Sequence, residues 1–169
     1  MKKKGKRRPG VRINPLFILE SMEKLSASDK LKMKTYHHSA MTVLVNGQGD
    51  ELNWNCLAGV IMIGSWLSQP GKLYPEAEST FNMAWKCLLN AGYRHSQGKS
   101  MGFTGLEMKI MNTVLLIHDE QLDNATIGQI EAAREYAISL VDKLSYAVVV
   151  PKLTGLHEVT DMDIYVLGD

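Results

Sequence analysis

Apolar side chains recur every three or four residues along five stretches of the chain, which is the spacing of one face of an α-helix. The five predicted helices cover about residues 29–45, 50–67, 75–95, 104–122 and 126–144. Turn-forming residues separate them, such as Asn46-Gly47 after the first helix. The fourth helix opens with a capping box, in which Thr104 and Glu107 satisfy each other's backbone N–H groups. The pattern therefore predicts a mainly α protein built as a bundle of about five helices.

The second predicted helix is apolar on nearly every side and carries no charge over residues 52–69. This run sits at the short limit of the roughly 17–25 apolar residues that a membrane span requires, and Asn53 and Ser65 interrupt it. Small residues such as Gly59 and Gly64 would let neighbouring helices approach closely. We therefore expect a central helix surrounded by the others, and no membrane as a partner.

The two ends of the chain lack this pattern. Residues 1–15 are predicted to be an extended basic arm, because Pro and Gly punctuate them and their like charges repel. The helical domain is expected over residues 16–145. Residues 146–169 are predicted to be a short β-prone extension, since 146–150 and 163–167 are rich in Val, Ile and Tyr. These two runs would form a terminal hairpin or pair with another chain, which is compatible with a homodimer.

The formal net charge of +1 conceals a strong asymmetry. Residues 1–12 hold seven of the 19 Lys and Arg residues and no Asp or Glu, so the remaining chain has 12 basic against 18 acidic residues, a net charge near −6. A basic arm on an acidic body can bind polyanions through the arm while the body repels them. Because cations that neutralise phosphates release counterions, we expect salt-sensitive, sequence-independent contact with DNA or RNA.

Lys30 and Lys34 extend this positive charge, because they share the solvent side of the first predicted helix with His38. The predicted nucleic-acid-binding residues are therefore Lys2, Lys3, Lys4, Lys6, Arg7, Arg8, Arg12, Lys30 and Lys34. The alternative is that the arm only improves solubility or meets an acidic protein, and that the acidic body binds a host protein complex and modulates it.

Cys56 and Cys87 lie in apolar stretches of predicted helices and in no CxxC or Cys/His spacing, so we expect buried free thiols rather than zinc ligands. Nothing in the sequence suggests export, and the basic N-terminus lacks the apolar core of a signal peptide. The expected location is the cytoplasm.

His118 is the most notable candidate for chemistry. It falls at the centre of the apolar face of the fourth predicted helix, Asp119 follows it, and His38 on the first helix could join them. His and Asp ligands of this kind hold the catalytic metal ions of HD-type phosphohydrolases. Asp119 is turned about 100° from His118 on the helix, however, so we expect a buried, hydrogen-bonded structural histidine. His38, His118 and Asp119 remain the metal-ligand candidates for the alternative, a metal-dependent hydrolase.

No Walker loop, GxGxxG fingerprint or nucleophile elbow is present, so no catalytic residue and no cofactor is predicted, and the chain is not expected to be an enzyme. Glu131, Glu135 and Asp142 form an acidic row that we expect to face solvent on the last predicted helix. Arg134 falls near the edge of the apolar stripe, where it would extend along the apolar surface or pair with a carboxylate from another helix.

Four segments together resemble a known group of proteins. They are RRPGVRINP at 7–15, HSAM at 38–41, TGLE at 104–107 and IHDEQLDNAT at 117–126. Over roughly residues 7–144 the chain thereby resembles uncharacterised small helical proteins encoded on phages and plasmids of proteobacteria; residues from 145 onward depart from them. The resemblance implies carriage by a mobile element and no activity that could be transferred. With the charge pattern, it favours a mobile-element accessory protein that contacts nucleic acid, ahead of an anti-defence factor that inhibits a host complex.

Overall fold

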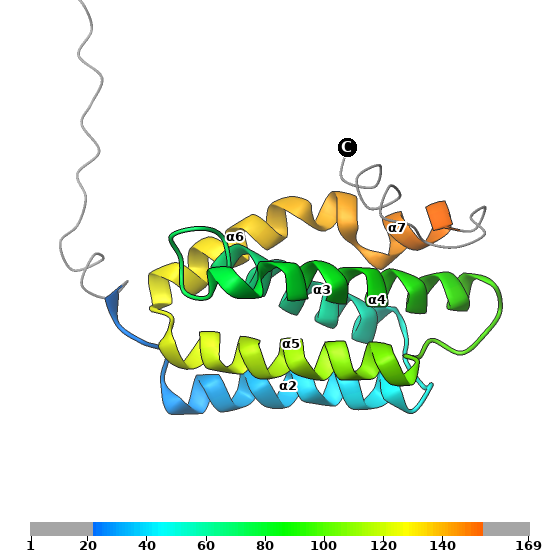
Figure 1. The fold of residues 1–169 in the computed structure, drawn as a ribbon, viewed down its shortest axis with the longest axis horizontal. Helices are drawn as coiled ribbons and strands as arrows, with labels where there is room; N and C mark the ends of the chain where they lie inside the picture. Colours follow the sequence, from blue (N-terminus) through cyan, green and yellow to red (C-terminus); the bar gives the residue numbers. More distant parts are fainter. Residues whose placement is uncertain (1–21, 154–169) are drawn as a thin grey trace, which may run out of the picture.

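The computed structural model describes residues 22–153, which form six α-helices and one 3-10 turn. The helices are, in chain order, α2 (Ala27–Val45), α3 (Glu51–Leu67), α4 (Glu78–Ser96), α5 (Gly105–Asn124), α6 (Ile127–Leu144) and α7 (Tyr146–Leu153). The 3-10 turn η1 (Pro75–Ala77) precedes α4. In Figure 1 the long helices α2, α3, α4, α5 and α6 pack along one common direction, with the short α7 beside them. The predicted mainly α, five-helix bundle is confirmed, and α7 is an addition to it.

Local capping residues fix where the helices begin. Ser26, Asp50, Thr104 and Thr126 each accept a hydrogen bond from a backbone N–H in the first turn of the helix that follows. The predicted capping box is confirmed: the Thr104 N–H donates to Glu107 Oε2 (2.7 Å), and the Glu107 N–H donates to Thr104 Oγ1 (3.4 Å). These donors would otherwise lack an intrahelical partner.

The central helix of the bundle is α3, as its composition predicts. It contacts α2, α4, α5, α6 and α7. Gly64 allows α4 to pack closely, because a Cβ at this position would lie 2.1 Å from Cε1 of the fully buried Phe81. Within the described residues, none of the helices has both the length and the apolar character needed to cross a bilayer.

The end of the described chain differs from its prediction. Residues 146–153 form helix α7, whereas the Val-rich run 146–150 predicted a β-prone extension. The second β-prone run, 163–167, and the hairpin that it would complete lie outside the described residues. The basic arm predicted over residues 1–15 lies outside them as well.

Long-range packing explains why α7 is helical. Tyr146 begins the helix by donating its backbone N–H to Asn55 Oδ1 on α3 (2.8 Å). Val149 and Val150 are buried in the bundle. Gly92 on α4 leaves room for them, because a Cβ there would lie 2.7 Å from Val150 Cγ2. Contacts with α3 and α4 therefore outweigh the strand preference of the valines.

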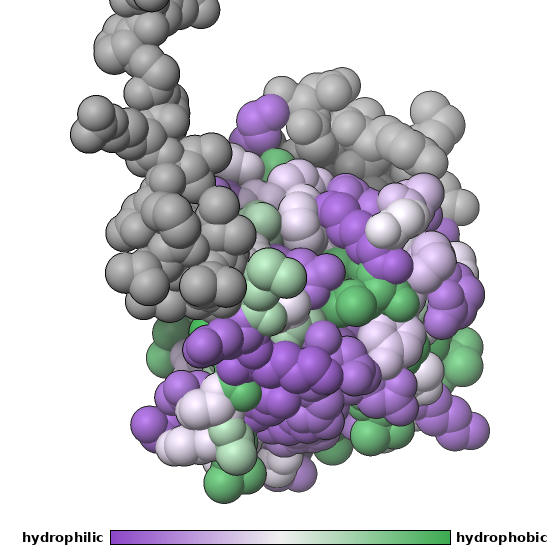
Figure 2. All heavy atoms as spheres, turned by 90° about the vertical axis from the view of Figure 1, so that its left-hand side faces the viewer, coloured by the Kyte–Doolittle hydropathy of each residue, from purple (hydrophilic) through white to green (hydrophobic). Residues whose placement is uncertain are grey.

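The chain enters the bundle at the end where α2 and α6 begin and α5 finishes (Figure 1). Lys24 forms an antiparallel bridge with Thr126, and the Ile127 N–H donates to the carbonyl oxygen of Glu23 (2.6 Å). Figure 2 views this end, where the described surface is largely hydrophilic. The first described residues, 22–24, therefore lie beside the start of α6.

Candidate functional sites

Two of the predicted nucleic-acid contacts, Lys30 and Lys34, are already paired within the bundle. Lys34 Nζ lies 2.9 Å from Asp123 Oδ2 on α5. Lys30 Nζ lies 4.0 Å from Asp123 Oδ1 and donates to the Asp123 carbonyl oxygen at 3.1 Å. The hydrogen bond from Lys34 lowers the pKa of Asp123. Both ammonium groups are engaged at the α2–α5 contact, so they offer phosphates less charge than their position on a helical wheel suggests.

The histidines meet at the same α2–α5 contact. His118 is completely buried and its Nδ1 lies 3.3 Å from Gln121 Oε1, which confirms the predicted buried, hydrogen-bonded histidine. The ring of His37 packs against it, with the two centroids 5.3 Å apart. His38 Nε2 lies 2.9 Å from Asp119 Oδ2. His38 and Asp119, two of the three predicted metal-ligand candidates, are thus in contact across the two helices.

The buried histidine is neutral at pH 7. Burial, reinforced by the charge of His37, lowers the pKa of His118 to about 3. Burial also lowers the pKa of His37. Three buried polar atoms here lack a hydrogen-bond partner, namely His37 Nδ1, His118 Nε2 and Asp119 Oδ1. Even so, no group of three His, Cys, Asp or Glu residues within 22–153 could hold a metal ion, so this geometry gives the hydrolase alternative no ligand set.

The two cysteines are free thiols, as predicted. Cys87 is buried and Cys56 is half-buried. Burial raises the pKa of each thiol to about 11. Because the thiolate is the reactive form, neither side chain is poised as a nucleophile at pH 7.

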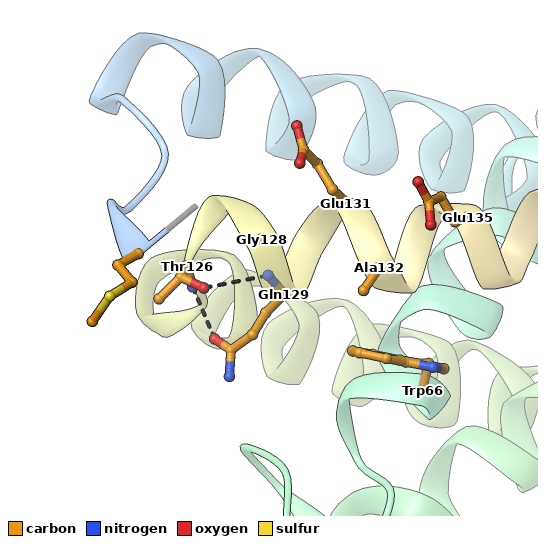
Figure 3. A pocket seen from close by; sticks show the side chains of 8 residues that line it. Trp66, Thr126, Gly128, Gln129, Glu131, Ala132 and Glu135 are labelled. Atoms are coloured by element: carbon orange, nitrogen blue, oxygen red, sulfur yellow. Dashed lines mark hydrogen bonds between the residues drawn. The ribbon is translucent and has the colours of Figure 1, made fainter. Parts of the chain in front are cut away.

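A solvent-open cavity of about 570 Å³ lies between the start of α6 and the end of α3, and we call it the acidic pocket. Its lining includes Met22, Trp66, Thr126, Gln129, Glu131 and Glu135. Figure 3 shows Glu131 and Glu135 on successive turns of α6, and Ala132 of the same helix facing the Trp66 ring. Lys72 Nζ lies 2.9 Å from the centroid of that ring. Two members of the predicted solvent-facing acidic row thus border a cavity where the described chain begins.

A second cavity, of about 340 Å³, lies between α3 and α6, and we call it the apolar groove. Most of its lining is apolar, and Arg134 is the one charged residue among the lining residues. Ile138 and Val141 beside it expose 57% and 45% of their surfaces. Exposed apolar side chains gathered at a groove are typical of a surface that contacts another protein.

Comparison of the chain with protein-family models, with curated proteins and with solved structures finds no match. What the protein does has therefore to be inferred from its charges, its cavities and its buried groups.

Proposed function

We propose that the protein binds nucleic acid through residues 1–12 of the basic arm, largely without regard to sequence. The observation that carries this proposal is the segregation of charge: seven Lys and Arg residues stand together without an acidic residue, on a chain whose remainder is near −6. Arg makes bidentate contacts with phosphate and Lys adds point charges. The resemblance to phage- and plasmid-encoded proteins supports an accessory role on a mobile element as part of the same proposal.

The pairing of cations in the bundle supports giving the main role to the arm. Lys30 and Lys34 contact Asp123, and Lys32 Nζ lies 3.8 Å from Asp29 Oδ1. Helix α2 therefore has little unpaired positive charge along its length. In this proposal Lys30 and Lys34 are secondary contacts, and the acidic bundle is held away from the phosphates by repulsion.

The test is a fluorescence-anisotropy titration of the full chain with single- and double-stranded oligonucleotides at several salt concentrations. Each neutralised duplex phosphate contributes about −0.9 to the slope of log affinity against log salt, so seven cations predict a slope of up to about −6. Replacing all seven arm cations by Gln should remove this dependence, whereas Lys30→Gln with Lys34→Gln should keep most of it. Salt-independent binding, or full binding by the neutral-arm variant, would refute the proposal.

The apolar groove favours a second candidate function, in which the bundle binds a host protein and modulates its complex. A partner with an apolar helix could pack against Ile138 and Val141 and place an acidic side chain near Arg134. Replacing Ile138 by Glu should then abolish recovery of that partner with the full chain, whereas Glu at Leu116, an exposed residue of α5, should not. Equal recovery with both variants contradicts this candidate, and sedimentation shows whether the partner is a second copy.

A further inference from the structure

The acidic pocket lies where the described chain enters the bundle, and its lining suits a cationic side chain. Met22, the first described residue, lines it together with Glu131 and Glu135 (Figure 3). Trp66 contributes an aromatic ring that already attracts one cation, since Lys72 Nζ lies over it. Carboxylates and an aromatic ring in one cavity are the groups that hold Lys and Arg side chains.

The two carboxylates of the pocket have no counterion within the described chain. Neither Glu131 nor Glu135 forms an ion pair with any residue between 22 and 153. They stand four residues apart on α6, where like charges repel and destabilise the helix. Both side chains are exposed, so a cation from outside the described bundle can approach them. Such a cation would relieve the repulsion.

The arm can supply that cation. Nine residues, 13–21, separate Arg12 from Met22 at the pocket. An extended chain spans at most about 3.3–3.6 Å per residue, so this linker lets every arm cation reach a cavity that begins at its own anchor. A tether of this length gives an effective concentration on the order of millimolar, at which weak contacts suffice for docking.

We propose that the acidic pocket binds Lys and Arg side chains from residues 1–12 of the chain's own arm, and that this docking competes with nucleic acid for the arm. The competition rests on the proposed function, whereas the docking itself does not. In the docked state, Glu131 and Glu135 form ion pairs with arm cations that would otherwise contact phosphates. A polyanion with more negative charges than the pocket draws these cations away from it, so the pocket selects against weakly charged ligands.

Docking is tested first in the full chain without nucleic acid. Backbone amide resonances of residues 126–135 and the Trp66 indole resonance are compared between the wild type and the variant with all seven arm cations replaced by Gln. We expect shift differences concentrated at the pocket, which disappear at about 0.5 M salt because exposed charges are then screened. They should also disappear when Glu131→Gln and Glu135→Gln are combined. Identical spectra at the pocket in the two arm forms would overturn the proposal.

Competition is tested by oligonucleotide titration at low salt. The pair Glu131→Gln and Glu135→Gln should raise the affinity of the full chain between about two- and tenfold, because it removes two exposed ion pairs that hold the arm. The matched control is Glu51→Gln with Asp142→Asn, which removes the same charge at the opposite ends of α3 and α6. This control should give the smaller gain. Equal rises in affinity in both double variants would show that only the net charge matters, and would overturn the competition.

The two experiments separate the docking from the proposed function. Arm-dependent shifts at the pocket without nucleic-acid binding would support the docking and overturn the proposed function. Salt-dependent nucleic-acid binding without arm-dependent shifts would support the proposed function and overturn the docking.

Discussion

Acid should destabilise the bundle through His118, and replacing this residue by Leu should remove the effect. The ring is fully buried on α5, and burial, reinforced by the charge of His37, lowers its pKa from 6.5 to about 3. The folded protein therefore excludes a proton that the unfolded chain binds below pH 6.5. The stability is complete above pH 6.5 and falls as the pH decreases, until the pH reaches about 3.

The size of the effect follows from the interval between the two pKa values. Each pH unit within it costs about 1.4 kcal/mol of unfolding free energy, so a fall from pH 6.5 to pH 5 removes about 2 kcal/mol. Among the groups around the ring, His37 and Lys34 on α2 oppose protonation, and the hydrogen bond with Gln121 favours it. Burial is the largest of these influences and fixes the sign.

Urea unfolding followed by circular dichroism, at pH 7 and at pH 5, measures this effect. Between the two pH values, the wild type should lose about 2 kcal/mol more than His118→Leu. The comparison uses the difference between pH values in each protein, so the two need not be equally stable at pH 7. His118→Gln serves as a second variant if the Leu variant does not fold. Equal losses in wild type and variant would show that His118 binds no extra proton on unfolding, and would refute the reasoning.

Two further predictions concern packing and a half-buried ion pair. Gly64→Ala should lower the free energy of unfolding by about 1–3 kcal/mol, because the added Cβ would overlap Phe81. Gly59→Ala should instead raise it by up to about 1 kcal/mol, because a Cβ there would meet nothing within 4 Å. Urea unfolding compares the two variants, and equal effects would contradict the close approach of α4 at Gly64. Arg94→Met should lower the free energy of unfolding by about 3 kcal/mol, because it leaves the buried Glu107 carboxylate without the ion pair that Arg94 Nη2 forms with it at 2.6 Å. Burial raises the pKa of Glu107, but its hydrogen bonds with Arg94 and Thr104, together with the Arg94 charge, outweigh burial and lower the pKa overall. The stability of the wild type relative to Arg94→Met should therefore be largest at neutral pH and should decrease as the pH falls through that lowered pKa. A stability difference that stays constant in acid would contradict this prediction.

The helix boundaries were predictable because they depend on residues close together in sequence. Thr104 and Glu107 lie three positions apart and cap the start of α5. Asp50 caps α3 in the same way. The central place of α3 was predictable from composition, since a helix without charge over most of its length can only be stable when other helices surround it.

The features that could not be predicted lie where contacts between distant residues decide the structure. The run 146–150 favours a strand locally, yet the space beside Gly92 makes a helix the better-packed form. Lys34 and His38 stand on the polar side of α2, but carboxylates on α5, 89 and 81 residues later, draw them into that contact. The acidic pocket was equally hidden, because no local pattern brings Trp66 to the start of α6.

The position of the acidic pocket also changes how salt should act on nucleic-acid binding. The bridge between Lys24 and Thr126 anchors the described chain next to the pocket that Glu131 and Glu135 line. In the proposed docked state, a duplex must therefore displace up to two ion pairs of the arm before it forms its own. Each phosphate contact contributes about 0.9 to the magnitude of the salt slope, and each displaced ion pair offsets part of that gain. Neutralising both carboxylates should therefore steepen the slope by up to about 2, while neutralising Glu51 and Asp142 should leave it nearly unchanged. An equal slope in wild type and in both pairs of variants would mean that the arm is never docked when it meets its ligand.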